Sequence, residues 1–479
     1  IYKIDQKSNS FFHFYLINSC IINLNEQNKI DKFNVSTLKF DMDIKKMSLS
    51  GWGNNLSIFS NVYNPENNDE IINIILKDKI SNFVTRGLGR SYGDSSLADN
   101  IISLKNYKKF FNFDENKGII ECSSNYSLGE LIKIILEKGW FFNVTPGSKF
   151  VTVGGAVASD VHGKNHHLDG SFSDYVISLK IITAEGKLYN CSRNENQQLF
   201  QATCGGMGLM GIIVSAKIQL SKLKSKFIDT QIIKTKNLKE TIVKFKELNN
   251  NKYIIAWIDT TAKNEAKGRS IIFIGNHVDD GDLKFEEKKI ISIPIKFPGF
   301  ILNKYTIKLF NKIYYHFHKH KKKFKQNLND FFYPHDNINN WNNLYGKNGF
   351  IQIQILIEEK DPKIIINKIL DFFQEREQHS FLGSIKEFGK GNGNYLSFPN
   401  KGYTLTLELK MTKKLNEVYQ EFEHLLTKHK TKIYLTKDSF MSEQYFKKTY
   451  SNYNKFKKIK NKYDPLNLIN SFQSRRINI

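Results

Sequence analysis

Residues 145–167 read TPGSKFVTVGGAVASDVHGKNHH, a stretch rich in glycine and small residues that leads into a set of ionisable and amide side chains. Its glycines are Gly147, Gly154, Gly155 and Gly163. Glycine costs backbone entropy, so such a cluster is typical of a main chain that turns through positive φ or lies against a flat or anionic ligand. The stretch therefore favours a ligand-binding site, with a tight loop between strands as the alternative.

Two further glycine clusters lie in the same half of the chain. The first, RGLGRSYGD at residues 86–94, lacks the Walker A pattern and the dinucleotide fingerprint GxGxxG. It can form a turn whose backbone N–H groups point inward beside Arg86 and Arg90, which is how proteins build a nest for a pyrophosphate; a structural turn is the alternative. The second is GGMGLMG at residues 205–211. Together the clusters predict a dinucleotide bound in an extended form.

The bulk composition limits the classes of protein that remain. A chain of 479 residues is too long for one ordinary core, so we expect two domains or three. The net charge of +24 would permit binding to nucleic acid or to an anionic membrane. The excess is mostly lysine spread along the whole chain, and no nucleic-acid motif occurs, so we expect no nucleic-acid partner. No apolar run is long enough to predict a transmembrane helix.

The cysteines and histidines give no sign of a metal or disulfide framework. The four cysteines are scattered without a CxxC pair, which favours a reducing compartment. His162, His166 and His167 could suggest a metal site, but HExxH is absent and the neighbouring Lys164 and Asn165 are poor zinc companions. We therefore expect no metal, and interpret these side chains as donors and charge stabilisers near a redox cofactor and its substrate.

Local patterns divide the chain into parts. Residues 1–46 read as a leader outside the fold, with no signal-peptide pattern, and Met42 or Met47 would be a natural start. Strands and helices interleave in the first half, which indicates an α/β or α+β fold. Strands are expected at 82–85, 118–122, 176–183, 211–220, 253–259, 270–274, 349–357 and 403–409, and helices at 71–79, 128–138, 154–160, 238–249, 362–376 and 415–429.

Lys437 lies in the segment YLTKD at residues 434–438, after an apolar strand-like run. A lysine here could simply be solvated. The functional alternative is an amine beside a cofactor, with a pKa lowered by burial and by a cationic neighbourhood so that it can accept a proton.

These residues together resemble a known family. The first half resembles the FAD-binding domain of the vanillyl-alcohol oxidase/p-cresol methylhydroxylase flavoproteins. More narrowly, the chain from about residue 51 onward is similar to the oxidising subunits of decaprenylphosphoryl-β-D-ribose 2′-epimerases. The motifs that match, in the same order, are RGLGRSYGD, TVGGA, HGKNHH, GII and YLTKDS, at residues 86–94, 152–156, 162–167, 211–213 and 434–439.

The resemblance implies an α+β fold: a two-subdomain FAD-binding domain (47–224), a substrate domain (225–431) built on an antiparallel sheet with helices on one face, and a C-terminal segment (432–479) that returns to the active site. It implies non-covalent FAD held by Arg86, Gly87, Leu88, Gly89, Arg90, Ser91, Tyr92, Gly93, Pro146, Gly147, Ser148, Thr152, Val153, Gly154, Gly155, Ser159, Asp160, Val161, His162, Gly163, Gly208, Gly211, Ile213 and Tyr434. The substrate would contact Tyr92, Lys164, Gln352, Gln354, Lys386 and Thr404.

The implied chemistry is oxidation of a sugar 2′-hydroxyl of a polyprenyl-phosphoryl ribose. Lys437 would be the base, with Tyr434 and His162 as further catalytic residues, and a short-chain reductase partner would complete the epimerisation. The chain departs from the family where Tyr403-Thr-Leu-Thr406 replaces Trp-Asn-x-Cys, and where Phe332 replaces a tyrosine. These departures leave the sugar and its lipid carrier open. An aldonolactone oxidase acting on a soluble lactone, and a non-catalytic basic binding protein, are the alternatives.

The segments 291–302 and 316–325 suggest a contact with a membrane. The first is apolar and broken by proline, and the second is dense in His and Lys. One interpretation is an insertion with a solvated basic face. The other is a surface that meets anionic headgroups while apolar residues dip into lipid. The expected location is therefore cytoplasmic or peripheral at a membrane.

Overall fold

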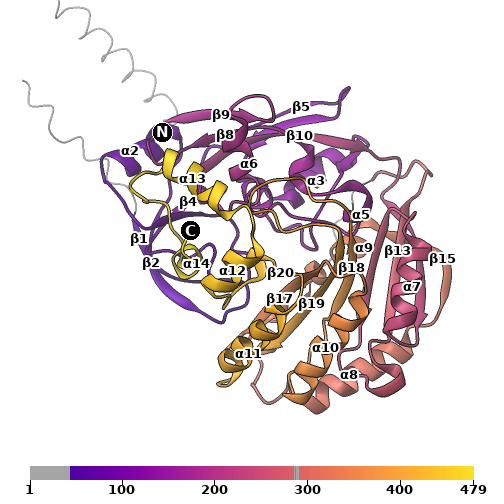
Figure 1. Ribbon diagram of the computed structural model, residues 1–479. Helices are drawn as coiled ribbons and strands as arrows, with labels where there is room; N and C mark the ends of the chain where they lie inside the picture. Colours follow the sequence, from indigo (N-terminus) through magenta and orange to yellow (C-terminus); the bar gives the residue numbers. More distant parts are fainter. Residues whose placement is uncertain (1–43, 285, 287–290) are drawn as a thin grey trace, which may run out of the picture. The chain divides into compact units, whose positions relative to one another are not determined.

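The computed structural model describes residues 44–284, 286 and 291–479, whose helices and strands are labelled in Figure 1. Most of the predicted leader, residues 1–43, lies outside the described residues. The first strand nevertheless begins inside the predicted leader, at Lys45, and pairs with the next strand over its full length. A start at Met47 would therefore remove the first residues of that strand.

The N-terminal sheet has the strand order β1-β2-β4-β3. Its strands are β1 (Lys45–Ser50), β2 (Ser57–Tyr63), β3 (Phe83–Arg86) and β4 (Asn100–Ser103), and α2 (Asn68–Leu76) lies between β2 and β3. β4 runs parallel to both β2 and β3. The glycine loop at residues 86–94 begins at the end of β3.

A second sheet has the order β5-β6-β10-β8-β9, with β7 also paired to β10. The strands are β5 (Phe111–Asp114), β6 (Ile119–Ser123), β7 (Trp140–Phe142), β8 (Val176–Ile182), β9 (Leu188–Ser192) and β10 (Ile212–Lys222), with helices α3 (Leu128–Leu136), α4 (Val153–Ala158), α5 (His166–Asp169), η1 (Phe172–Tyr175) and α6 (Gln197–Thr203). A capping box at Ser127 and Glu130 begins α3. The glycine-rich stretch at residues 145–167 lies between β7 and β8, and its first part is the loop that leads into α4.

The third and largest sheet has the order β15-β11-β13-β12-β18-β19-β17-β20. Its strands are β11 (Phe227–Thr235), β12 (Tyr253–Ile258), β13 (Ser270–His277), β15 (Lys321–Asn327), β17 (Phe350–Ile357), β18 (Ser384–Phe388), β19 (Gly402–Lys410) and β20 (Thr431–Ile433). In Figure 1, α7 (Leu238–Leu248), α10 (Pro362–Glu375) and α11 (Leu415–Thr427) lie along this sheet. Between β12 and β13 lies η2 (Asn264–Ala266), and between β13 and β17 lie β14 (Ile291–Ser292), α8 (Lys304–Phe317), α9 (Leu328–Phe332), η3 (Pro334–Asn337), β16 (Ile338–Asn339) and η4 (Trp341–Tyr345).

The two faces of the large sheet differ because side chains alternate along a strand. In β17, Ile351 and Ile353 join the main hydrophobic core, whereas Gln352 and Gln354 point the other way and line a cavity. β19 repeats the pattern, with buried leucines alternating with Thr406 and Glu408. The sequences FIQIQILI and GYTLTLELK thus encode a sheet with an apolar face for helices and a polar face for a site.

The C-terminal segment returns to the N-terminal half. After β20 come η5 (Leu435–Lys437), α12 (Glu443–Thr449), α13 (Tyr453–Tyr463) and α14 (Phe472–Ile477). The Arg476 guanidinium donates to Asp94 at 2.8 Å and to Asp438 at 2.7 Å, and both carboxylates are buried. The backbone N–H of Tyr92 donates to the Thr436 carbonyl oxygen at 3.0 Å. These contacts fix residues 434–438 against the first glycine loop.

The structure differs from the sequence expectations in two instructive places. The helix expected over 154–160 ends at Ala158, because Asp160 takes a left-handed φ of 40°. The basic tract at 316–325 is not a separate insertion: it joins the end of α8 to β15, which pairs with β11 at the edge of the large sheet.

Candidate active site

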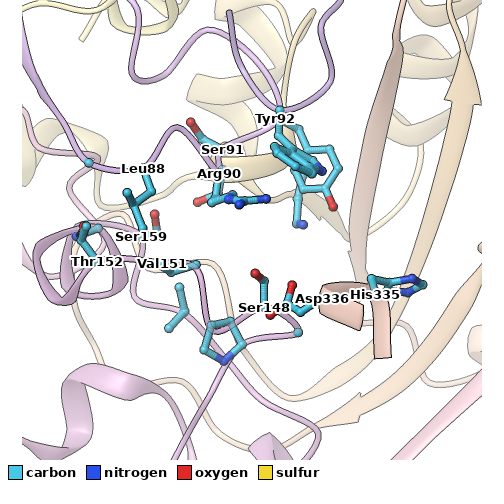
Figure 2. A pocket seen from close by; sticks show the side chains of 18 of the residues that line it. Leu88, Arg90, Ser91, Tyr92, Ser148, Val151, Thr152, Ser159, His335 and Asp336 are labelled. Atoms are coloured by element: carbon cyan, nitrogen blue, oxygen red, sulfur yellow. Dashed lines mark hydrogen bonds between the residues drawn. The ribbon is translucent and has the colours of Figure 1, made fainter. Parts of the chain in front are cut away.

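A cavity of about 920 Å³ lies between the glycine loops of the N-terminal half and the polar face of the large sheet. Figure 2 shows Arg90, Ser91 and Tyr92 on one side of it, facing Ser148 and Asp336 on the other. The cavity gathers segments that are hundreds of residues apart in the sequence.

The first glycine loop is held in place by its own arginine. Arg86 donates to the Ser50 carbonyl oxygen at 2.7 Å and to the Ser96 hydroxyl at 2.9 Å, so its guanidinium fixes the loop. Gly89 has a φ of 64°, and a Cβ there would collide with the Arg86 guanidinium. Glycine is therefore favoured at this turn.

Arg90 is placed differently from Arg86. Its guanidinium carbon lies 3.9 Å above the centre of the Trp52 ring, and its Nε is buried without a hydrogen-bond partner among the described residues. A buried donor at a cavity wall is costly unless a ligand satisfies it. This arginine therefore offers a cation and a free donor to an anionic group in the cavity.

The glycine stretch at residues 147–155 brings the main chain of α4 to the cavity wall. Thr152 caps α4 by accepting from the Gly155 N–H at 3.1 Å. A Cβ at Gly154 would lie 3.1 Å from the Ser124 Cβ, and a Cβ at Gly87 would lie 2.5 Å from the Thr152 hydroxyl oxygen. Gly87 thus lets the first glycine loop approach the start of α4, and Gly154 lets α4 approach the end of β6.

The glycine cluster at residues 205–211 lines the cavity only in part. Gly208, with a φ of 78°, and Gly211 line the cavity, as does Ile213 at the start of β10. Gly205 and Gly206 do not: a Cβ on Gly205 would lie 3.1 Å from the Ser397 backbone, and one on Gly206 would collide with the carbonyl oxygen of residue 202.

His162 is buried in an aromatic cluster with Phe388, Phe398 and Tyr434. Burial lowers its pKa well below the usual value, and nearby lysines lower it further, so the ring is neutral. Its Nε2 lies 2.9 Å from Nε2 of Gln354, whereas its Nδ1 has no partner among the described residues.

Tyr434 lies beside His162 at the wall of the same cavity, where its hydroxyl donates to the Ser159 carbonyl oxygen at 2.7 Å. Burial also raises the pKa of this phenol. The hydroxyl is therefore engaged with the end of α4, and the aromatic ring is what faces the cavity.

The polar face of the large sheet presents a buried carboxyl group, Glu408. It accepts hydrogen bonds from the Tyr345 hydroxyl at 2.8 Å and from the Gln352 amide. Burial raises the pKa of this carboxyl to about 7. Because Glu408 occurs in an alternating strand, the sequence analysis did not single it out.

Lys164, Lys386 and Lys437 line the same cavity, and the Lys164 amine also donates to the Phe331 carbonyl oxygen. Burial lowers the pKa of Lys164 and of Lys437 to about 7, and that of Lys386 to about 8. Lys386 lowers the pKa of the other two amines further, whereas Glu408 opposes this at Lys437. The Lys437 Nζ lies 3.7 Å from the centre of the Tyr92 ring. Clustered amines of this kind suit an anionic substrate and can exchange protons near neutral pH.

Part of the cavity wall is apolar and aromatic, and the Lys164 Nζ lies 4.4 Å from the centre of the Phe331 ring in this part. Trp257 and Phe273 reach it from the sheet, Phe331 and Phe332 from α9, and Tyr314 from the inner face of α8. Such a wall suits a hydrocarbon group rather than a second polar one.

Most of the predicted cofactor and substrate residues line this cavity. Those that do not are Gly93, Val153, Asp160, Gly163 and Thr404. A Cβ at Gly93 would collide with the Asp438 carbonyl oxygen, and Val153 is fully buried. Asp160 accepts from the Ser397 hydroxyl at 2.6 Å, turned away from the cavity.

Residues that the sequence did not indicate also line it. The most notable are Trp52, Glu408, His335 and Asp336. Burial lowers the pKa of His335 to about 4, and Lys149 N–H donates to Asp336 at 2.7 Å. No sequence pattern marks these positions, because they come to the cavity through tertiary packing.

The wall fits a dinucleotide cofactor with a flat ring system. Glycine backbone approaches the cavity from two loops, and buried polar atoms at Arg90, Asn125 and His162 face it without partners among the described residues. Across residues 44–284, 286 and 291–479, no group of His, Cys, Asp and Glu side chains is close enough to hold a metal ion.

Comparison with known proteins agrees with this geometry. Residues 60–192 match the model of an FAD binding domain. The chain is 29% identical to decaprenylphosphoryl-β-D-ribose oxidase of Mycolicibacterium smegmatis, over 93% of this chain and 100% of that protein. It is 24% identical to D-arabinono-1,4-lactone oxidase of Candida glabrata over 33% of this chain and 31% of that protein. It is 25% identical to human Delta(24)-sterol reductase over 28% of this chain and 25% of that protein.

The chain is therefore an FAD-dependent oxidoreductase that acts on CH–OH donors, with the α+β fold that the sequence predicted. Its similarity to decaprenylphosphoryl-β-D-ribose oxidase and to D-arabinono-1,4-lactone oxidases supports a sugar-related oxidase. A non-catalytic basic binding protein, one of the alternatives from the sequence, is excluded.

Proposed function

We propose that this protein oxidises the 2′-hydroxyl of a polyprenyl-phosphoryl-β-D-ribose to a ketone. The observation that carries the proposal is that Lys164, Lys386 and Lys437 line one cavity together with aromatic side chains from β12, β13, α8 and α9. The amines suit a phosphate, and the aromatic side chains suit a polyprenyl chain. The similarity to decaprenylphosphoryl-β-D-ribose oxidase over the whole of that protein supports the same substrate class.

FAD, when bound, supplies a hydride acceptor at N5 of its ring. We propose that Lys437 takes the proton from the 2′-hydroxyl while the hydride leaves C2′. With a pKa of about 7, a large part of the Lys437 amine is neutral at physiological pH and can act as a base. Glu408 and the Tyr92 ring hold the amine in position and stabilise the ammonium that forms.

We propose that Lys164 and Lys386 bind the phosphate. Their lowered pKa values mean that an arriving phosphodiester would draw protons onto both amines, so substrate binding should be accompanied by proton uptake near neutral pH. Gln352, Gln354 and Tyr92 would hydrogen-bond the sugar hydroxyls, with Thr404 supporting Gln354 from behind at 3.5 Å.

We propose that the cofactor is held non-covalently, with its pyrophosphate between loop 86–93 and residues 147–155 and its ring system near His162, Ile213 and Tyr434. Tyr434 acts as a positioning residue, since its hydroxyl is bonded to α4. Denaturation should then release a yellow cofactor into the supernatant; colour that stays with the precipitated chain would contradict non-covalent binding.

A ketone at C2′ can be reduced again from the opposite face. We therefore propose that a short-chain reductase takes the product and completes a 2′-epimerisation. Incubation of the oxidised product with such a reductase and a reduced nicotinamide should give the epimeric sugar.

An aldonolactone oxidase remains the second candidate, because part of the chain resembles D-arabinono-1,4-lactone oxidases. A neutral lactone, however, carries no negative charge that the three lysine amines could bind. Anaerobic mixing separates the two functions: a short-chain polyprenyl-phosphoryl ribose should bleach the flavin absorption, and D-arabinono-1,4-lactone should not. The reverse result would assign the lactone.

A further inference from the structure

Helix α8 (Lys304–Phe317) exposes several large apolar side chains, which is unusual for a helix face in contact with water. Its Tyr305, Leu309, Ile313 and Phe317 are exposed by 72%, 59%, 55% and 84%, respectively. They recur every four residues, so with about 3.6 residues per turn they form one stripe along the outer face. Phe300, which precedes the helix by a few residues, is 77% exposed. A contiguous apolar surface of this kind marks a binding surface.

The inner face of α8 explains why the helix is held there. Ile307 and Asn311 are buried, and the Asn311 amide donates to Asp259 at 3.1 Å and to the Ser380 carbonyl oxygen at 3.2 Å. Further along this face, Tyr314 lies 4.8 Å from the Trp257 ring and lines the cavity together with His318. The exposed stripe therefore lies on the face of α8 opposite to the residues that pack on the sheet and line the cavity.

Lysines flank the apolar stripe. Lys308 and Lys312 each precede a stripe residue by one position and are exposed, and Lys319 follows the helix. Further along the basic tract 316–325, Lys323 and Lys325 on β15 are instead paired with Asp229 at 3.6 Å and Asp280 at 2.9 Å. The combination of an apolar stripe with neighbouring cations is therefore found on α8.

We propose that the outer face of α8 docks on an anionic lipid bilayer, with the apolar stripe in the acyl boundary and the lysines at the headgroups. The charge decides between occupants: a second copy of this chain, itself at +24, would bring like charges together, whereas anionic lipid is complementary. No helix in the described part of the chain has the length and apolar character needed to span a bilayer. Docking through α8 would bring the aromatic part of the cavity wall close to the lipid. The use of this placement for a polyprenyl substrate rests on the proposed function, whereas the docking itself does not.

The test uses the full FAD-loaded protein and sedimentation with vesicles of phosphatidylcholine, with or without phosphatidylglycerol. We expect binding to the mixed vesicles. Replacing Leu309, Ile313 and Phe317 by Gln should weaken it by roughly tenfold for each side chain. Replacing Lys308, Lys312 and Lys319 by Gln should weaken it by about fivefold for each lysine, and high salt should have the same effect.

Matched controls carry the same changes elsewhere. Phe59→Gln with Leu466→Gln removes other exposed apolar side chains, and Lys108, Lys455 and Lys458 are exposed lysines far along the chain from α8. Both controls should bind vesicles like the wild type. If the triple α8 variant does not fold, as judged by flavin absorption, Phe317→Gln alone tests the stripe, because this residue is the most exposed of its members.

Three results would overturn the proposal: no binding of the wild type to mixed vesicles, equal loss in the control variants, or α8 variants that bind vesicles normally. A change in sedimentation coefficient of the α8 variants without any change in vesicle binding would assign the stripe to a second copy of the chain. Flavin reduction by detergent-solubilised substrate is measured in parallel. If it fails while vesicle binding behaves as stated, the proposed function is wrong and the docking surface stands.

Discussion

Replacing Lys437 by Met removes the amine that we propose as the base and keeps the length of the side chain. General-base catalysis contributes about a hundredfold to ten-thousandfold, so the rate of flavin reduction should fall by a factor in that range. The cofactor should stay bound, because the predicted FAD contacts come mainly from the N-terminal half. Stopped-flow absorbance under anaerobic conditions measures both quantities.

The pH dependence of the rate of flavin reduction tests the role of Lys437 more specifically. The amine must be neutral to accept a proton, and its pKa lies at about 7. The wild-type rate should therefore rise with pH through about 7 and level off above it, with roughly a tenth of the plateau rate at pH 6. Lys437→Met should lack this rise.

Lys432 provides the matched control. It is also a half-buried lysine whose pKa is lowered by burial, but its amine lies 3.3 Å from the Phe398 carbonyl oxygen and it does not line the cavity. Lys432→Met should keep the wild-type pH profile. Near wild-type flavin reduction in Lys437→Met, or an unchanged rise with pH, would refute the role of Lys437.

Three other predictions concern the parts that support this chemistry. Glu408→Gln removes a negative charge that raises the pKa of Lys437, so the half-maximal rate should shift to lower pH; an unmoved profile would exclude this coupling. Gly89→Ala forces an alanine to a φ of 64° against Arg86, and should lower FAD occupancy in purified protein with a cost of about 1–2 kcal/mol in the loop; full occupancy would show that the turn adapts. Arg476→Met leaves the buried Asp94 and Asp438 without their cation, so urea unfolding should show a loss of about 3 kcal/mol, and a loss below 1 kcal/mol would contradict this.

Much of the fold could be predicted because its local patterns are strong. The expected helix over 238–249 corresponds to α7 at Leu238–Leu248, and the strand over 349–357 to β17 at Phe350–Ile357. Shorter strands were missed, among them β18 (Ser384–Phe388), since few residues carry the alternation there. β15 was missed for another reason: its lysines read as a solvated tract, whereas they lie on an edge strand, where charged residues are common.

The site could be predicted where glycine or a motif marks it. The loops at 86–92 and 147–155 line the cavity because close backbone approach needs glycine, which the sequence displays directly. Glu408 could not be found in this way, since a glutamate in an alternating strand usually faces water. Its burial depends on Tyr345 and Gln352, which come from other elements of the fold.

The same limit applies to α8. Its inner face reads as an ordinary amphipathic helix, and the side that covers the cavity is decided by the buried contact between Asn311 and Asp259. A hydrogen bond between residues 52 positions apart leaves no local pattern in the sequence. Which face of α8 packs on the sheet and which face is exposed can therefore be seen only in the structure.

The most direct test of the central claim is the anaerobic reduction of the flavin by a polyprenyl-phosphoryl ribose that carries deuterium at C2′. We expect flavin bleaching that is several-fold slower than with the unlabelled sugar, no such slowing when deuterium is placed at C3′, and a 2′-keto product. Bleaching that is insensitive to deuterium at C2′, or no bleaching by this sugar at all, would contradict hydride transfer from C2′ and with it the proposed function.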